Sequence, residues 1–180
     1  DYGYKNFSTN EPYAGFGTRF DLKENFPLME GHDLRAYFNF STRANEKIKI
    51  KFALSPVSMD GAMNNLQTEA PGWDFDAVRV SGQQQWEKEL GKVKVETIDD
   101  SDKINFYTAV YHAFINPTIY MDVDGRYKGL DQEIHQADGF TNYTTFSLWD
   151  THRALHPLFT ILQPKRDDDM IKSMLAHYRQ

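Results

Sequence analysis

The spacing of apolar residues changes along the chain, and this change constrains the fold more than any other feature of the sequence. In residues 47–54 the even-numbered positions are apolar and lysines stand at 47, 49 and 51. Such alternation is typical of a β-strand with one buried and one solvated face, as in an antiparallel sheet. Residues 16–22 and 34–40 alternate in the same way. The first third of the chain is therefore predicted to be part of a β-sandwich, with too few strands to complete one.

From residue 58 onward the apolar spacing becomes helical. The predicted helices cover residues 59–66, 75–90, 101–116, 146–162 and 167–180. Ser101 is the predicted N-cap of the third helix, Pro117 ends it, and His156-Pro157 interrupts the fourth. Residues 93–98 alternate briefly as a strand, and residues 121–145 read as a long loop that can hold a hairpin. Strands followed by helices suggest two domains in tandem.

The expected organisation has three parts. Residues 1–70 are the C-terminal part of a β-sandwich domain, residues 71–100 a linker helix with a short strand, and residues 101–180 the start of a helical domain. Residue 1 is Asp, and no Gly, Asn or Pro ends the last helix. We therefore expect a fragment of a longer protein.

Composition excludes several classes of protein. The chain has 20 Lys and Arg against 26 Asp and Glu, a net charge of −6, and no basic run that would suit nucleic acid. No apolar stretch approaches the roughly 18–20 residues of a membrane span. Cysteine is absent, which excludes thiolate metal sites, cysteine nucleophiles and disulfides. Aromatic residues make up 14% of the chain, and they serve either as core or as platforms for sugar rings.

Two short patterns suggest metal sites but fit them poorly. Asp122-Val-Asp124-Gly125 matches positions 3, 5 and 6 of a calcium loop, yet Tyr120 stands at position 1 and Asp131 at position 12. A turn is the favoured interpretation.

His152 and His156 are four residues apart, the spacing of a zinc pair on one helical face. Arg153 replaces the glutamate of the zinc-protease pattern, so zinc is not favoured.

The segment Ser147-Leu-Trp-Asp-Thr-His-Arg153 carries the chemistry of a sugar site. Trp149 offers a face for stacking, Asp150 accepts hydrogen bonds from hydroxyls, and Arg153 donates them. Trp149 and Arg153 share a face if the helix is continuous. The alternative is a structural Asp–Arg pair beside a buried Trp.

Glycoside hydrolysis requires two carboxyl groups on either side of the scissile bond. The candidates in this chain are Glu69, Asp74, Asp76, Asp124, Asp131, Glu133 and Asp150. Spacing alone does not select a pair from them.

Several segments in order carry a family resemblance. They are Leu54-Ser-Pro-Val-Ser-Met-Asp-Gly-Ala-Met-Asn-Asn-Leu66, Glu69-Ala-Pro-Gly-Trp-Asp-Phe-Asp76, Phe106-Tyr-Thr-Ala-Val-Tyr-His112, Asp124-Gly-Arg-Tyr127 and Phe146-Ser-Leu-Trp-Asp-Thr-His-Arg153. Over residues 34–180 the chain resembles glycoside hydrolase family 92, the exo-acting α-mannosidases, which are mostly bacterial.

The resemblance implies an α+β, two-domain arrangement, with the end of an N-terminal β-sandwich, a helical linker and the first helices of an (α/α)6 barrel. It implies calcium-dependent, inverting hydrolysis of terminal α-linked mannose, α-1,2 or related, from mannose-containing glycans. The catalytic acid, the base and the calcium ligands are expected beyond this segment, which alone should be inactive. Trp149, Asp150 and Arg153 are the expected mannose contacts, and the role of His152 stays open.

The resemblance also implies a periplasmic, outer-surface or secreted bacterial protein. The alternative from another class is a non-catalytic carbohydrate-binding or structural module. A phosphorylase would need a phosphate site, which the sequence does not show.

Overall fold

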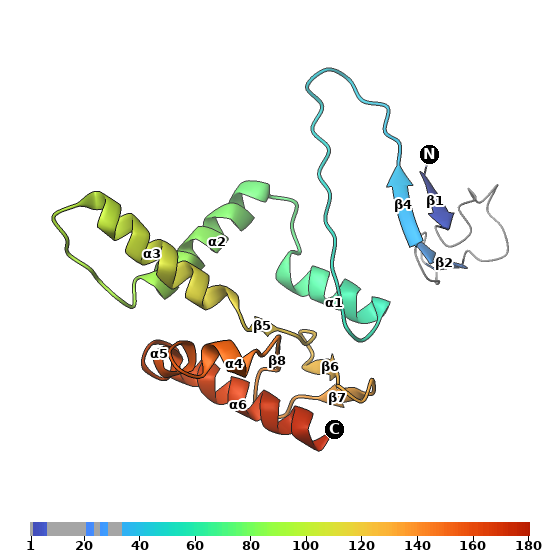
Figure 1. Ribbon diagram of the computed structural model, residues 1–180. Coiled ribbons are helices and arrows are strands. Elements are labelled where there is room, and N and C mark those ends of the chain that lie inside the picture. Colours follow the sequence, from blue (N-terminus) through green and yellow to red (C-terminus); the bar gives the residue numbers. More distant parts are fainter. Residues whose placement is uncertain (1, 7–20, 24–25, 29–33) are drawn as a thin grey trace. The chain divides into compact units, whose positions relative to one another are not determined.

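The structure is a computed structural model that describes residues 2–6, 21–23, 26–28 and 34–180, with side chains described from residue 39 (Figure 1). The chain divides into two compact units, residues 1–48 and residues 49–180. Each unit is described separately below.

The described residues of the first unit form two antiparallel strand pairs. Strand β1 (Tyr2–Asn6) pairs with β4 (Leu34–Phe38), with Tyr2 opposite Phe38. Strand β2 (Asp21–Lys23) pairs with β3 (Phe26–Leu28). The predicted strand at 34–40 is thus confirmed over residues 34–38. Most of the predicted strand at 16–22 lies outside the described residues.

The second unit is mainly helical. Its helices are α1 (Met59–Glu69), α2 (Phe75–Leu90), α3 (Asp100–Ile115), α4 (Leu148–Thr151), α5 (Leu155–Leu162) and α6 (Pro164–Arg179). Two small antiparallel pairs lie between α3 and α4: β5 (Thr118–Ile119) with β8 (Tyr143–Thr144), and β6 (Arg126–Lys128) with β7 (Ile134–Gln136). The expected hairpin in residues 121–145 is therefore present.

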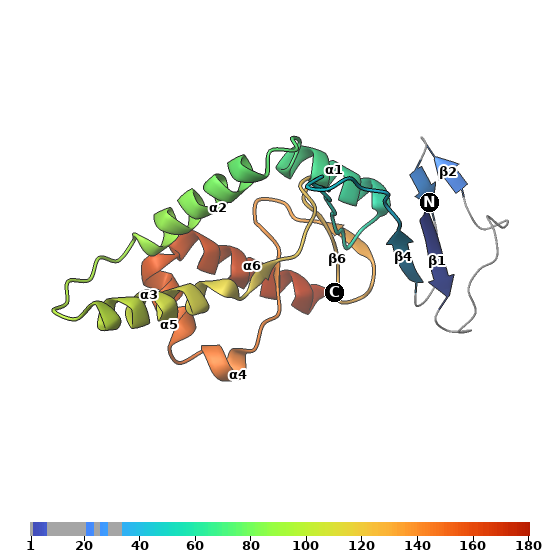
Figure 2. The ribbon, with the colours of Figure 1, turned by 90° about the horizontal axis from the view of Figure 1, so that it is seen from above.

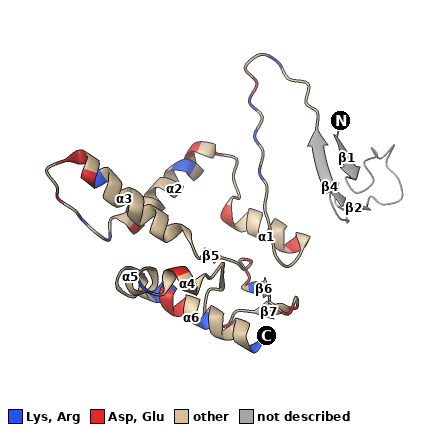
Figure 3. Cartoon of the chain, viewed as in Figure 1, with Lys and Arg blue, Asp and Glu red and all other residues tan. Residues whose placement is uncertain are grey.

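The helix starts follow local capping chemistry. Ser58 accepts a hydrogen bond from Gly61 N at the start of α1, and Asp74 accepts one from Ala77 N at the start of α2. Asp99, not Ser101, caps α3, because its carboxylate accepts from the backbone N of Ser101 at 2.9 Å. Acidic residues stand in the first turns of these helices, where the helix dipole favours them (Figure 3).

The core of the second unit joins α3, β8, α5 and α6. Its buried members are Val110, Phe114, Tyr143, Phe159 and Met170. In Figure 2, α3, α5 and α6 gather around this core, and α4 stands on the connection from β8 to α5. The helical residues that the structure describes hold no run that is both long and apolar enough to cross a bilayer.

The prediction for residues 47–54 is wrong in two respects. The segment is extended but pairs with no other described strand, and Phe52 and Leu54 are each 82% exposed. Instead the lysine face is engaged, since Lys51 Nζ donates to the carbonyl of Ala70 at 2.7 Å and lies 4.5 Å from the ring centre of Trp73. The brief strand predicted at 93–98 is also absent from this described stretch.

Candidate functional site

The predicted sugar-binding segment forms a single helical turn, α4, and the turn that follows it. Ser147 precedes the helix and donates from Oγ to a carboxylate oxygen of Asp150. Nδ1 of His152 lies 2.8 Å from the carbonyl of Leu148, so this ring closes the turn. In the structure His152 thus contacts the backbone of its own turn.

The helix ends at Thr151, and residues 152–154 are a turn before α5. Trp149 and Arg153 therefore do not share one continuous α-helical face, as the i, i+4 spacing had suggested. The interruption predicted at His156-Pro157 is therefore wrong in position, because Pro157 sits in the first turn of α5, where its missing N–H is not needed.

The three side chains proposed to bind sugar are exposed, although one carboxylate oxygen of Asp150 accepts from Ser147. Trp149 is 89% exposed, and Asp150 and Arg153 are exposed too. Among the described residues Asp150 and Arg153 form no ion pair. The alternative of a structural Asp–Arg pair beside a buried Trp is thus contradicted. The segment, called the α4 segment below (residues 147–153), offers an aromatic face, a carboxylate and a guanidinium to solvent.

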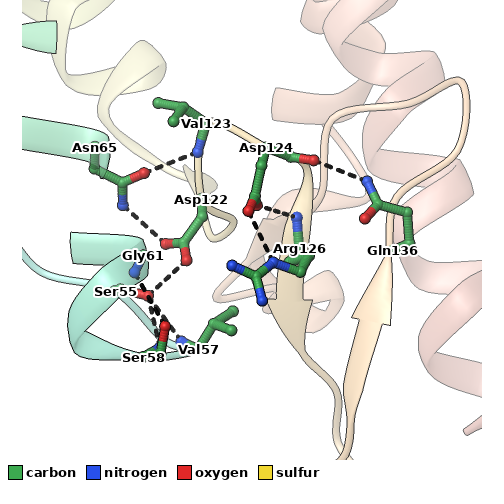
Figure 4. A network of polar contacts seen from close by, with 10 residues as sticks. All are labelled: Ser55, Val57, Ser58, Gly61, Asn65, Asp122, Val123, Asp124, Arg126 and Gln136. Atoms are coloured by element: carbon green, nitrogen blue, oxygen red, sulfur yellow. Dashed lines mark hydrogen bonds and ion pairs between the residues drawn. The ribbon is translucent and has the colours of Figure 1, made fainter. Parts of the chain in front are cut away.

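The Asp122–Gly125 pattern forms a turn and not a cation site (Figure 4). The carboxylate of Asp124 accepts two hydrogen bonds from Arg126, one from the backbone N at 3.0 Å and one from Nε at 2.8 Å. These hydrogen bonds hold the pKa of Asp124 below its usual value. Gly125 takes φ +84°, a left-handed conformation that favours glycine in such a turn.

Asp122 is 1% exposed and points away from that turn, toward α1. Its Oδ2 accepts from Ser55 Oγ at 2.6 Å, and its Oδ1 accepts from Asn65 Nδ2 at 2.8 Å. We call Ser55, Gly61, Asn65, Asp122 and Val123 the Asp122 cluster. With both carboxylates engaged in the protein, Asp122 and Asp124 do not fit a calcium site.

His152 lies in the turn after α4 and His156 lies in α5, so the two do not share the helical face that a zinc pair needs. Nδ1 of His156 is 3.0 Å from a carboxylate oxygen of Asp167, which is buried in the first turn of α6. In the described part of the chain, no three His, Asp or Glu side chains come together in a way that could hold a metal ion.

The other candidate carboxylates are mostly committed to local structure. Asp74 caps α2, and Asp76 pairs with Arg79 at 3.4 Å. Asp131 accepts from the backbone N of Glu133 and lies 2.9 Å from His135 Nε2. The backbone hydrogen bond, together with His135, lowers the pKa of Asp131. These contacts single out no general acid and base pair.

The sequence analysis missed the Asp122 cluster. Asn65 stands 57 positions before Asp122 and occupies the interior of a helix, where asparagine is a weak helix former. A polar residue at a buried helical position was the available signal. The partner was not visible, because pairing over such a separation depends on the tertiary fold.

Comparisons with known proteins agree with the motifs. The sequence model of the glycosyl hydrolase family 92 catalytic domain matches residues 61–180. The chain is 41% identical to the family 92 α-mannosidase BT3965 of Bacteroides thetaiotaomicron, with a TM-score of 0.71, covering 90% of this chain and 23% of that one. The same relative has also been solved in complex with mannoimidazole.

Two further relatives are more distant. The family 92 glycosyl hydrolase ccman5 is 30% identical, with a TM-score of 0.64, over 69% of this chain and 17% of that one. A protein described as an uncharacterized secreted glycosidase of Arthroderma benhamiae is 29% identical over 87 residues, which are 46% of this chain and 11% of that protein. The chain thus spans less than a quarter of the length of each relative.

The family match covers two thirds of the chain and places it among the glycoside hydrolases. The chain belongs to glycoside hydrolase family 92.

Proposed function

We propose that this chain is part of an exo-acting α-mannosidase that removes terminal α-linked mannose, through α-1,2 or related linkages, from glycans. The observation that carries the proposal is the 41% identity to an α-mannosidase over 90% of the chain. That this relative was solved with mannoimidazole supports a mannose-like ligand. Because the chain spans 23% of that relative, we assign the activity to the longer protein and not to these 180 residues alone.

The α4 segment is the proposed contribution of this chain to the mannose site. Trp149 would stack its exposed face on the sugar ring, because aromatic faces pack well against apolar C–H surfaces. Asp150 would accept hydrogen bonds from two neighbouring hydroxyl groups. Arg153 would donate to a third, and its planar guanidinium suits such contacts.

Domain arrangement and mechanism are proposed from the family resemblance. We propose that residues 1–70 belong to a β-sandwich, residues 71–100 to a linker and residues 101–180 to the first part of an (α/α)6 barrel. Hydrolysis would proceed with inversion, with the general acid, the general base and the calcium ligands outside this segment. No step is assigned to calcium here, because the described carboxylates do not fit a site for it.

The proposed location is outside the cytoplasm of a bacterial cell, either periplasmic, at the outer surface or secreted. The support is the family resemblance, together with a fungal relative that is described as secreted. Immunodetection in cell fractions of the source organism tests this assignment, and recovery only in the cytoplasm would contradict it.

The function is tested by purifying the complete protein and its variant Asp150→Ala and measuring hydrolysis of an aryl α-mannoside. We expect kcat/KM to fall by at least about tenfold, which corresponds to the loss of a hydrogen bond to a charged group. Asp168→Asn is the matched control, because Asp168 is an exposed acid on α6 whose side chain is 60% exposed. Unchanged kinetics for Asp150→Ala would favour a structural role for the α4 segment. A complete protein that binds mannosides without hydrolysing them would favour the non-catalytic carbohydrate-binding module.

A further inference from the structure

We propose that Asp122 is a positioning residue for the mannose site. It acts by fixing the strand pair β5–β8, from which the chain continues into the α4 segment. The inference rests on the proposed function and names a residue that none of the sequence motifs had assigned to the site. It is carried by the geometry of the Asp122 cluster and by the two hydrogen bonds between Tyr120 and Asn142, the residue before β8.

The first step is that Asp122 is a buried anion held by neutral donors. Its side chain receives hydrogen bonds from Ser55 and Asn65, and no Lys or Arg of the described part lies within ion-pair distance of it. A buried charge without a cation contributes little to stability compared with a well-packed apolar side chain. Its directional contacts, however, fix the position of the backbone that carries it.

The second step is that every described partner of Asp122 is itself held. Asn65 also donates to the carbonyl of Leu54 at 3.1 Å and accepts from the backbone N of Val123 at 2.9 Å. Ser55 Oγ accepts from the backbone N of Val57 and of Ser58 (Figure 4). The cluster therefore ties α1 and the segment before it to residues 122–123.

The third step connects the cluster to β8. Tyr120, two residues before Asp122, forms two hydrogen bonds with Asn142. The backbone N of Tyr120 donates to the carbonyl of Asn142, and Nδ2 of Asn142 donates to the carbonyl of Tyr120, both at 2.9 Å. Asn142 is fully buried and directly precedes β8. Ser147, which holds Asp150, follows five residues later. A shift of Asp122 therefore displaces the strand pair β5–β8 and the α4 segment beyond it.

The test is a double-mutant cycle in the complete protein, with aryl α-mannoside kinetics and a melting temperature for each variant. We expect Asp122→Ala to raise KM by about fivefold to tenfold, because a misplaced Asp150 loses its hydrogen bond to the sugar. In the Asp150→Ala background the same change should alter KM by less than about twofold, because the sugar contact that the backbone shift would weaken is already absent, whereas independent sites would add. Asp122→Asn, which keeps one acceptor oxygen, should restore part of the wild-type KM.

Glu89→Gln is the matched control for a general loss of stability. Glu89 lies in a separate hydrogen-bond network on α2, so its loss should lower the melting temperature without raising KM. If Asp122→Ala does not fold, Gly61→Ala replaces it, because an added Cβ there would push against the Asp122 carboxylate. Additive effects of the Asp122 and Asp150 changes, or an unchanged KM, would overturn the inference. A silent Asp150→Ala would instead overturn the proposed role of the α4 segment, and a complete protein that hydrolyses no α-mannoside would overturn the proposed function.

Discussion

A Cβ atom added at Gly61 would overlap Oδ2 of Asp122, and Ser55 Oγ would lie only 2.8 Å from it. Gly61 is buried in the first turn of α1. The missing side chain lets the carboxylate approach this turn, where the partial positive charge of the helix start favours an anion. The glycine is therefore explained by this close approach.

Replacing Gly61 by Ala should lower the stability of the unit that contains it. Overpacking of a well-packed site costs about 1–3 kcal/mol, which outweighs the gain of up to about 1 kcal/mol from the better helix former. Denaturant unfolding of the complete protein, followed through the transition of this unit, measures the change. In an Asp122→Ala background the same substitution should cost less, because only one of the two close contacts, that with Ser55 Oγ, remains.

The matched control is Gly82→Ala in α2. No atom lies within 4 Å of a Cβ added there, so only helix propensity should act. We expect a gain of about 0.5–1 kcal/mol. A loss at Gly61 that is equally large without Asp122 would contradict the explanation by close approach of the Asp122 carboxylate.

A second prediction concerns the pH dependence set by Glu89. Burial alone would raise its pKa, but hydrogen bonds from Lys92 and Gln163, with the nearby charge of Arg166, together hold the pKa below its usual value of 4.5. The unfolded chain therefore binds this proton at a higher pH than the native state does. The contribution of Glu89 to stability is present above about pH 4.5 and is lost as the pH falls through its native pKa.

Melting temperatures of the wild type and of Glu89→Gln, measured between about pH 3 and about pH 7, test this prediction. The variant should be less stable at neutral pH, and its curve should fall less steeply in acid. Asp168→Asn is the control, because its ion pair with Lys172 is exposed and should change the curve little. Parallel curves for the wild type and Glu89→Gln would contradict the assignment.

The sequence was most informative where local chemistry decides the structure. Helix α2 begins at the predicted residue 75, because Asp74 provides an N-cap, and it ends at the predicted residue 90, directly before Gly91. Pro117 ends α3 near the predicted position for a similarly local reason. The alternation at 47–54 correctly predicts an extended segment. The alternation does not predict which face of the segment contacts the rest of the unit. In the structure the face that carries the lysines makes these contacts.

The assignment of Trp149, Asp150 and Arg153 to the candidate site stays a prediction, and the geometry of the segment that carries them was not predicted. The spacing of Trp149 and Arg153 places them on one face only if the helix continues, and it stops at Thr151. The bond between Asn65 and Asp122 joins positions 57 apart. No helical or strand period links such residues, so only the folded chain brings them together.

A third prediction concerns the contacts of Lys51. Its Nζ donates to the carbonyls of Ala70 and Gly72, at 2.7 and 3.2 Å, and lies over the ring of Trp73. Lys51→Met keeps much of the apolar stem but removes the donors, so it should destabilise the connection between α1 and α2 by about 1 kcal/mol. Limited proteolysis should then cleave residues 70–74 faster.

Lys47→Met is the matched control, since Lys47 lies in the same run and has no hydrogen bond or ion pair with another described residue. It should leave the cleavage rate unchanged. Equal rates for the wild type and Lys51→Met would show that the connection is held by other contacts.

A final prediction concerns calcium in the complete protein. We expect a chelator to abolish hydrolysis of an aryl α-mannoside and added calcium to restore it, as the family resemblance implies. Asp124 and Asp131 should take no part, because Arg126 occupies the first carboxylate and His135 with the backbone of Glu133 occupies the second. Asp124→Asn and Asp131→Asn should therefore require the same calcium concentration for half-maximal activity as the wild type. A calcium requirement about tenfold higher in either variant would identify the substituted residue as a calcium ligand and correct our interpretation.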